Sequence, residues 1–245
     1  MTAVAKPTAA VAMALSGVSR DFHQGEEVVH ALRSTDLEIR SGELTGILGP
    51  SGSGKSTLLT VMGGLRTPTT GTVEIGGNPF SALPERKRAQ LRRRWLGFVL
   101  QSSGLVPFLT LADQFSLHDR VLRRPPAADR RDELLDTLGI SKRIRAYPSQ
   151  LSGGEKQRAA IAVAVYHDPK VILADEPTAA LDSRRAHDVA RLLAQQTHEQ
   201  GKATVMVTHD ERILEVCDRI MVMHDGVLRE QRQPGRHRSP AALRP

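Results

Sequence analysis

The segment Gly49–Thr57, GPSGSGKST, has the residue types and spacing of a phosphate-binding loop. Its glycines tolerate positive φ, so the backbone can curl tightly and turn successive N–H groups toward one phosphate. Lys55 adds a positive charge for the β- and γ-phosphates, and the Ser56 hydroxyl can bind Mg²⁺. The sequence therefore predicts a nucleoside triphosphate site. Its candidate loop residues are Gly49, Ser51, Gly52, Ser53, Gly54, Lys55, Ser56 and Thr57.

A second group of residues that could bind a metal or act in catalysis stands at the end of the apolar run Val171–Glu176, VILADE. A strand that runs beneath a phosphate loop can direct Asp175 at Mg²⁺, either directly or through water. A carboxylate beside a γ-phosphate can hold the attacking water and take its proton, and Glu176 is our candidate for that role. Side chains alternate along a strand, so we expect Asp175 and Glu176 to point in different directions.

A third candidate site is the start of a predicted helix, where Ser152, Gly153 and Gly154 stand in the sequence LSGGE. A helix N-terminus attracts anions, so this segment can form a second phosphate site. A capping box between Ser152 and Glu155 would explain the same residues without any ligand. Because the chain has only one phosphate loop, we favour two copies arranged head to tail, each presenting LSGGE to the nucleotide of the other.

Helices and strands must position these residues, and the order of the predicted helices and strands indicates an α/β fold. The buried strand Leu44–Leu48 leads into the phosphate loop, and the helix Ser56–Met62 follows it with its positive dipole end against the anion. The apolar strand Ala203–Val207 precedes a further candidate, His209. A mostly helical block at about 105–165 interrupts the pattern and predicts an inserted helical subdomain. We expect flexible tails at 1–12 and 231–245 around a domain at 13–230.

The remaining predicted elements are defined by periodicity and by turn residues. For the helix that follows Asp182 we expect Ser183 as the N-cap and Gly201 at the C-terminus. The predicted strands are Met13–Phe22, Val28–Leu32, Thr35–Ile39, Thr72–Ile75, Leu96–Leu100, Arg219–His224 and Val227–Glu230. The predicted helices are Glu85–Arg94, Leu109–Arg124, Ala127–Leu138, Gly154–Tyr166, Ser183–Gln200 and Glu211–Val216.

Composition narrows the class of protein. The chain has 245 residues, 40% of them hydrophobic, which is enough for a large core. Its single cysteine, Cys217, excludes an internal disulfide framework and a multi-cysteine metal site, and we expect a buried thiol there. No apolar run approaches the roughly 18–20 residues that cross a bilayer, and the first residues do not read as a signal peptide. Any membrane function therefore requires another chain to supply the spanning helices.

Over about Ala14–Glu230 the sequence resembles the nucleotide-binding subunits of ABC transporters, because their motifs occur in family order. Besides the phosphate loop, LSGGEKQR and VILADE, these motifs are the aromatic residue Phe22, Gln101, Asp182 and His209. The resemblance implies a RecA-like P-loop NTPase core with an antiparallel β subdomain and the inserted helical subdomain. It also implies ATP and Mg²⁺ as cofactors, and a paired ATPase subunit or homodimer with transmembrane permease subunits as partners.

The same resemblance assigns roles to individual residues. Gln101 would couple the Mg²⁺ and water site to the transmembrane partner, and Asp182 would cross the dimer interface. His209 would contact the γ-phosphate and position Glu176 and water. Phe22 is either a core residue or a ring on which adenine stacks, and base–aromatic stacking contributes roughly 1–3 kcal/mol.

A closer resemblance links GGLRTPTTGTVEIGG and LGFVLQSSGLVPFLT to the lipoprotein-releasing and macrolide-exporter ATPases, a group that includes the cell-division ATPase. The chain departs from the family at Val163, where arginine is usual, and at Leu100, where phenylalanine is usual. Phe22 likewise replaces the more common tyrosine.

Three functions follow from these observations. The first is an ATPase on the cytoplasmic face of the membrane that powers export, lipoprotein release or mechanotransmission through a separate permease. The second is a cell-division-type regulator without cargo. The third is an ABC ATPase that acts on nucleic acid or ribosomes. The net charge of +7 permits the third, but such proteins usually carry two ATPase units or a long coiled-coil insertion. The basic tail is a candidate contact for anionic lipids, with a solvated tail as the alternative.

Overall fold

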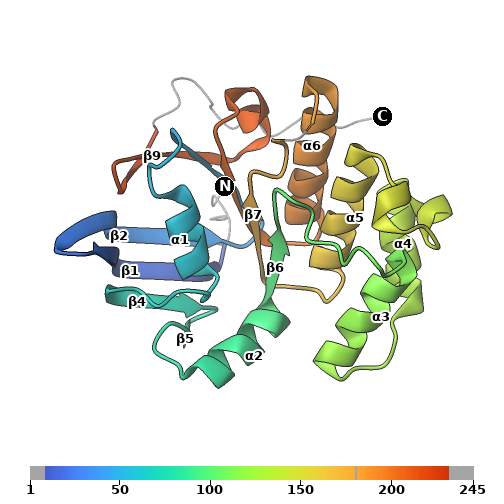
Figure 1. Cartoon of the computed structure of the whole chain (residues 1–245), viewed down its shortest axis with the longest axis horizontal. Helices are drawn as coiled ribbons and strands as arrows, with labels where there is room; N and C mark the ends of the chain where they lie inside the picture. Colours follow the sequence, from blue (N-terminus) through green and yellow to red (C-terminus); the bar gives the residue numbers. More distant parts are fainter. Residues whose placement is uncertain (1–8, 180, 232–245) are drawn as a thin grey trace, which may run out of the picture.

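The computed structural model describes residues 9–179 and 181–231, which form two sheets and a group of helices. The first sheet is antiparallel, has the order β2-β1-β4-β5, and consists of β1 (Val11–Gln24), β2 (Glu27–Arg40), β4 (Thr70–Ile75) and β5 (Asn78–Pro79). In Figure 1 its strands β1, β2 and β4 extend to the left of helix α1. This sheet is the expected antiparallel β subdomain.

The second sheet holds the strands that carry the predicted chemistry. Its order is β10-β9-β3-β8-β7-β6, and all neighbours are parallel except β10 with β9. The strands are β3 (Leu44–Leu48), β6 (Leu96–Val99), β7 (Val171–Asp175), β8 (Ala203–Thr208), β9 (Arg219–His224) and β10 (Val227–Glu230). β3, β7 and β8 are almost wholly buried, as expected for parallel strands covered on both faces.

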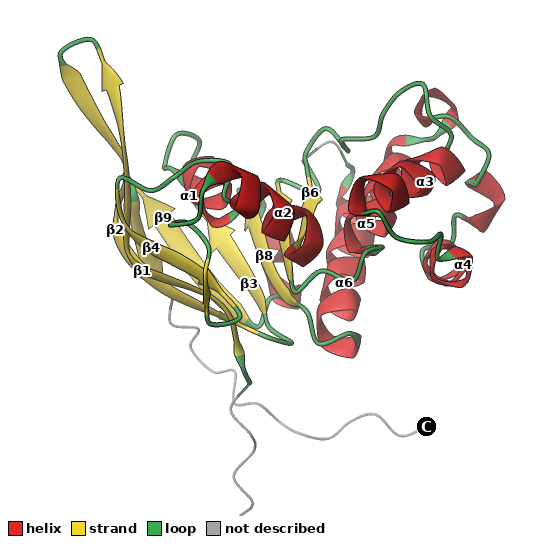
Figure 2. Ribbon diagram, turned by 90° about the horizontal axis from the view of Figure 1, so that it is seen from below, coloured by secondary structure: helices red, strands yellow, loops and turns green. Residues whose placement is uncertain are grey.

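Helices cover the two faces of the parallel sheet differently. One core joins the antiparallel sheet and α1 (Lys55–Met62) to one face, and includes Ile47, Leu58 and Val207. The other core joins α5 (Gly153–Val165) and α6 (Ser183–Glu199) to the opposite face, and includes Ile161 and Leu193. Figure 2 shows the strands of the antiparallel sheet and the helices α3, α4 and α5 at opposite ends of the molecule.

The chain between β6 and β7 is helical. It contains α3 (Leu111–Leu122) and α4 (Ala128–Thr137), two short 3-10 helices at Ser141–Arg143 and Pro148–Gln150, and then α5. Helix α2 (Glu85–Trp95) comes directly before β6. Within the described residues no helix combines the length and the apolar character needed to cross a bilayer. The fold is mixed α/β with a P-loop NTPase core, as the sequence predicts.

Several predicted boundaries were wrong. The strands expected at Val28–Leu32 and Thr35–Ile39 are one continuous strand, β2. β1 begins at Val11, inside the range expected to be a tail, and Leu100 lies beyond the end of β6. The helix expected at Glu211–Val216 is a 3-10 helix. The expected tails fall mostly on residues 1–8 and 232–245, which lie outside the described residues.

The N-cap of α6 is Asp182 and not Ser183. The carboxylate of Asp182 accepts a hydrogen bond from the backbone N–H of Arg185 at 3.1 Å. Both residue types are good caps, and the chain uses the one that comes first. Gly201 follows this helix with a φ of 61°, as expected for a glycine at a helix C-terminus. Cys217 is buried, as predicted.

Candidate nucleotide-binding site

The phosphate loop joins β3 to α1 and needs its glycines for two separate reasons. Gly52 and Gly54 have φ angles of 80° and 104°, which side chains rarely adopt. A Cβ at Gly54 would also lie 2.2 Å from the carbonyl oxygen of Ala31, and one at Gly49 would lie 2.3 Å from that of Met223. The loop therefore packs directly on the backbone of β2 and β9, which fixes its curvature.

Lys55 is the first residue of α1, and its ammonium group lies inside the curl of the loop. It is buried and donates hydrogen bonds to the carbonyl oxygens of Gly49 at 2.7 Å and Pro50 at 2.9 Å. Within the described residues no carboxylate forms an ion pair with it. A bound phosphate would supply the opposite charge at the N-terminus of α1, where the helix dipole also favours an anion.

The loop opens onto a cavity of about 400 Å³ in which the predicted residues meet. Gln101, Glu176 and His209 face the loop residues across this cavity, although they come from distant parts of the sequence. The predicted residues that line it are Ser51, Gly52, Gly54, Lys55, Ser56, Thr57, Gln101, Glu176 and His209. Ala31 also lines it and was missed, because it contributes backbone and its residue type carries no chemical signal.

Strand order explains why these residues meet. The carboxyl ends of β3, β8, β7 and β6 are consecutive along one edge of the parallel sheet. The phosphate loop follows β3, His209 follows β8, Glu176 follows β7, and Gln101 comes two residues after β6. Ligands of parallel α/β sheets bind at this edge.

Asp175 and Glu176 present unpaired oxygens at the end of β7. The Asp175 Oδ1 and Glu176 Oε2 atoms are buried and have no hydrogen-bond partner among the described residues. Burial raises the pKa of Asp175, and the charge of Glu176 raises it further, while Lys55 opposes both effects. Two buried oxygens without donors are a suitable environment for a cation and an ordered water.

The main chain turns sharply at Glu176, where φ is 47°. β7 ends at Asp175, so strand alternation does not extend to Glu176 and does not determine its direction. Its backbone N–H donates to the Val207 carbonyl at 2.9 Å, which holds the turn against β8. Non-glycine residues in this conformation are uncommon, and such strain concentrates at functional sites.

His209 contacts Glu176 directly. Its Nδ1 atom lies 2.9 Å from the Glu176 Oε1 atom, while most of the imidazole is exposed. The pair leaves Oε2 of the same carboxylate, which is buried, without a hydrogen-bond partner among the described residues. The arrangement can orient a general base beside the phosphate loop.

The LSGGE residues do not reach this cavity. Ser152, Gly153 and Gly154 begin α5, which Figure 1 shows on the other side of β7 and β6 from α1. The capping box is present, because the Ser152 hydroxyl accepts from the N–H of Glu155 and the Glu155 carboxylate accepts from the N–H of Ser152. These bonds, together with Arg143, lower the pKa of Glu155 to about 2.

Two further predicted residues also lie apart from the cavity. Asp182 caps α6 and pairs with Arg185. Phe22 has the guanidinium groups of Arg20 and Arg66 over its ring, at 4.9 and 5.1 Å from the centroid. Phe22 therefore already has cation–π partners within the chain. Gly49 and Ser53 lie in the phosphate loop and Asp175 is the last residue of β7, but none of the three lines the cavity.

The fold and the site together define a P-loop nucleotide hydrolase. A sequence model of the ABC transporter family matches residues 32–179, more than half of the chain. The chain belongs to this family and is an ATPase.

Comparisons with known proteins agree with this assignment. The "Putative hemin import ATP-binding protein HrtA" of Staphylococcus aureus (strain MRSA252) is 40% identical over 218 residues, which cover 88% of this chain and 98% of the relative. The dimeric post-hydrolysis structure of the ATP-binding cassette MJ0796 with ADP and Pi is 37% identical. Its TM-score is 0.82, over 91% of this chain and 99% of that one. The structure of cbiO1 from Clostridium perfringens, part of the ABC transporter complex cbiONQ, has 28% identity and a TM-score of 0.79, over 89% and 87% of the two chains.

Proposed function

We propose that this chain is the ATPase subunit of a membrane transporter and that it powers a separate transmembrane permease from the cytoplasmic face. The observation that carries the proposal is the single cavity shared by Lys55, Ser56, Gln101, Glu176 and His209. These groups come from four neighbouring strand ends, and they are the groups that phosphoryl transfer to water requires.

In this proposal the loop N–H groups and Lys55 bind the β- and γ-phosphates of ATP. Ser56, Gln101 and Asp175 hold Mg²⁺, which when bound neutralises charge on the phosphates. The described residues contain no cluster of three or more His, Cys, Asp or Glu side chains that could hold a metal by itself. This suits Mg²⁺, which keeps several waters and is usually bound through one or two carboxylates plus substrate phosphates.

Glu176 takes the proton of the attacking water, and His209 holds the carboxylate in the orientation that the 2.9 Å contact shows. Ser152, Gly153 and Gly154 act on the nucleotide of a second copy, because within one chain they lie away from the cavity. Asp182 then lies at the interface between the two copies. The capping box leaves the N–H groups of Gly153 and Gly154 available to that second phosphate.

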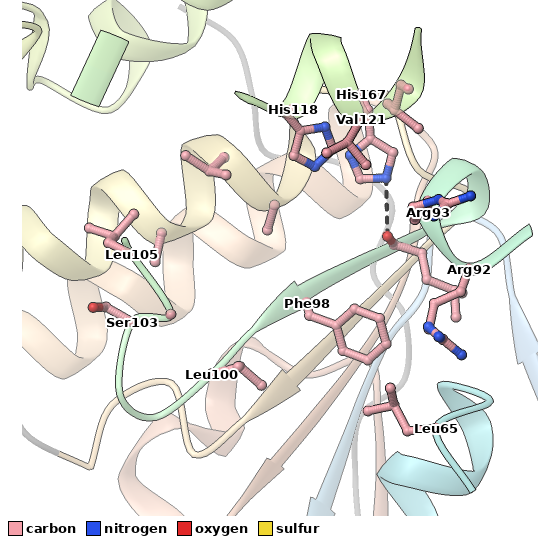
Figure 3. Close-up of a pocket in the computed structure, with 16 residues that line it drawn as sticks. Leu65, Arg92, Arg93, Phe98, Leu100, Ser103, Leu105, His118, Val121 and His167 are labelled. Carbon is pink, nitrogen blue, oxygen red and sulfur yellow. Dashed lines mark hydrogen bonds between the residues drawn. The ribbon is translucent and has the colours of Figure 1, made fainter. Parts of the chain in front are cut away.

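The permease would contact an apolar groove beside Gln101. The groove is a cavity of about 420 Å³ between β6, α3 and α5, shown in Figure 3 with Leu65, Phe98, Leu100 and Leu105 directed toward it. Leu65 and Leu100 are exposed, so the groove can accept apolar side chains from a partner. Its loop residues 100 and 103–105 flank Gln101, so pressure on the groove would reach the nucleotide site.

Two of the three departures from the family line this groove. Leu100 and Val163 stand where phenylalanine and arginine are usual, and neither touches the nucleotide cavity. We infer that they adapt the groove to the side chains of this chain's own permease and leave hydrolysis unchanged.

The direct test is Glu176→Gln, compared with the surface variant Glu199→Gln. We expect Glu176→Gln to lower the rate of ATP hydrolysis at least about 100-fold, because it removes the general base, and to retain nucleotide affinity within about threefold. It should also accumulate a nucleotide-bound dimer in gel filtration with Mg²⁺ and ATP. Hydrolysis near the wild-type rate in Glu176→Gln would overturn the assigned role.

For the cargo, the similarity to hemin import ATP-binding proteins favours hemin over the lipoproteins that the closer sequence resemblance suggests. The test measures hemin accumulation in cells with the wild-type chain and with Glu176→Gln. Loss of import would lower accumulation and loss of export would raise it. Equal accumulation in both strains would remove hemin as the cargo.

A further inference from the structure

A second cavity, which we call the arginine pocket, lies between α2 and the C-terminal end of α3. Its volume is about 690 Å³, and no carboxylate lines it. Five arginines do: Arg86, Arg93, Arg94, Arg123 and Arg124. Gln90, Val121, Leu122 and His167 complete the lining.

The arginines of helix α2 that have hydrogen-bond or ion-pair partners and those that have none among the described residues lie on different faces of the helix. Arg88 and Arg92 both pair with Glu85 and bind the Gly64 carbonyl, so they are structural. Arg86, Arg93 and Arg94 lie seven and eight residues apart, which places them on one helix face. Together with Arg123, they form no ion pair or hydrogen bond through their side chains with any described residue. The charges of these four arginines are therefore not neutralised by an ion pair within the described part of the chain.

The α3 side of the pocket is fixed in an unusual conformation. Arg123 ends α3 with φ 52° and ψ 45°, a left-handed position where glycine would be free of strain. Arg124 is held by Asp119 at 2.7 Å and lies over the Tyr166 ring at 4.4 Å. Its buried Nη2 atom has no hydrogen-bond partner among the described residues. An ordered guanidinium with an unused donor is suited to bind an anion.

The arginine pocket is continuous with the groove that we assign to the permease. Arg93, Val121, Leu122 and His167 line both cavities. Figure 3 shows Arg93, Val121 and His167 near one another at one end of the groove. A groove that contacts a transmembrane protein faces the membrane, so the arginine pocket faces it too. This step rests on the proposed function.

We propose that the arginine pocket binds the phosphate group of an anionic phospholipid in the adjacent leaflet. Guanidinium groups match phosphate oxygens in pairs, and the surface of the cytoplasmic leaflet is negatively charged. The contact would hold the ATPase against the membrane beside its permease. It places the lipid contact in the folded domain, in addition to the basic tail considered from the sequence.

The test is co-sedimentation of the full purified chain with vesicles, without permease. The vesicles contain phosphatidylcholine alone or with 30% phosphatidylglycerol, in about 0.1 M salt. The double variant Arg86→Gln/Arg94→Gln should bind the anionic vesicles about 25-fold more weakly, since each basic residue near such a surface is worth about fivefold. The matched control is Lys87→Gln/Arg145→Gln, which removes the same charge from α2 and from another exposed position outside the pocket.

Each outcome decides the proposal. If the two double variants weakened vesicle binding equally, net charge alone would explain the attraction, and the proposal would be overturned. Competition by 1 mM inorganic phosphate or pyrophosphate, with arginine-dependent binding of those ions, would assign the pocket to a soluble anion. Binding of a single-stranded oligonucleotide that depends on Arg86 and Arg94 would assign it to nucleic acid. ATP hydrolysis is measured in the same samples, so a failed lipid site with intact hydrolysis leaves the ATPase role in place.

Discussion

At the scale of single residues, His209 and Glu176 are in contact but should have different roles, which mutagenesis can distinguish. His209 is largely exposed and touches no loop residue through a hydrogen bond, whereas Glu176 is mostly buried. We therefore expect His209→Gln to lower kcat about 100-fold, because the carboxylate loses its orienting partner, with little change in KM. The control is His198→Gln, which alters an exposed histidine on α6. A rise in KM at unchanged kcat would instead make His209 a binding residue.

Gly52 and Gly54 are needed in the phosphate loop for different reasons. Both need positive φ, but a Cβ at Gly52 would meet no atom within 4 Å, whereas one at Gly54 would meet the Ala31 carbonyl. Gly52→Ala should therefore cost about 1–2 kcal/mol of unfolding free energy, and Gly54→Ala at least about 3 kcal/mol. Urea unfolding of the two variants measures the difference. Equal costs would show that β2 moves away from the loop without penalty.

Residue types predicted which residues would line this cavity, but not their conformations. Lys55, Gln101, Glu176 and His209 could be selected because each stands at a fixed place in a motif. The left-handed turn at Glu176 has no signal in its residue type, since glutamate seldom adopts it. Of the two arginines over the Phe22 ring, Arg20 is close to it in the sequence and Arg66 is far along the chain. Only the tertiary structure brings Arg66 to this ring.

At the scale of elements, β2 shows why the sequence suggested two strands. Arg33 and Ser34 interrupt the apolar alternation, and the β1–β2 pairing shifts register opposite this region. The strand continues because the Arg33 N–H bonds to the Gly226 carbonyl of the β9–β10 hairpin at 2.8 Å. A bulge of this kind disrupts the pattern of side chains without ending the strand.

The buried His167 stacks on the half-buried His118 of α3, and protonation of either ring opposes folding. His118 and His167 stack at 4.7 Å, and the His167 Nε2 atom lies 3.0 Å from the Leu96 carbonyl oxygen. Burial, together with the neighbouring His118 and Arg124, lowers the pKa of His167 to about 4, although the hydrogen bond to the Leu96 carbonyl and the charge of Asp168 oppose this shift. Burial, with Arg124, also lowers the pKa of His118.

This pair predicts the sign of the pH dependence of stability. A lowered folded-state pKa means that the unfolded chain binds the proton first, so stability is full above about pH 6.5 and falls as the pH drops toward 4. His167 should contribute a loss of about 1.4 kcal/mol per pH unit in that window. Urea unfolding at several pH values measures the slope, which His167→Gln should reduce and the exposed control His23→Gln should not. An unchanged slope in His167→Gln would contradict the assignment.

At the scale of the whole molecule, the sequence predicted the parts better than their arrangement. The order β3-β8-β7-β6 brings together four strand ends that are far apart in the chain, and no local pattern encodes that order. The family resemblance implied the class of fold but gave no strand order. The arginine pocket could not be foreseen, because the charged face of α2 is completed by Arg123 and Arg124 from α3.

The division of each site between two molecules gives the strongest test of the proposed mechanism. Lys55→Ala should abolish hydrolysis by disabling the phosphate loop. Gly153→Asp should abolish it by placing a negative charge against the γ-phosphate of the partner, while α5 still forms. Gly153 is exposed, its nearest neighbour to an added Cβ is 3.8 Å away, and an acid in the first turn of a helix is favourable.

Mixed in equal amounts and allowed to exchange, these two inactive variants should recover hydrolysis. In a mixed dimer, one site combines the intact phosphate loop of the Gly153→Asp chain with the intact LSGGE of the Lys55→Ala chain. Random pairing makes half of the dimers mixed, with one working site of two, so the expected activity is about one quarter of wild type if the sites act independently. The control mixes Lys55→Ala with Glu176→Gln, where both changes lie on the same side of the interface and no site is restored. Activity in the control mixture, or none in the test mixture, would contradict a site built from two chains.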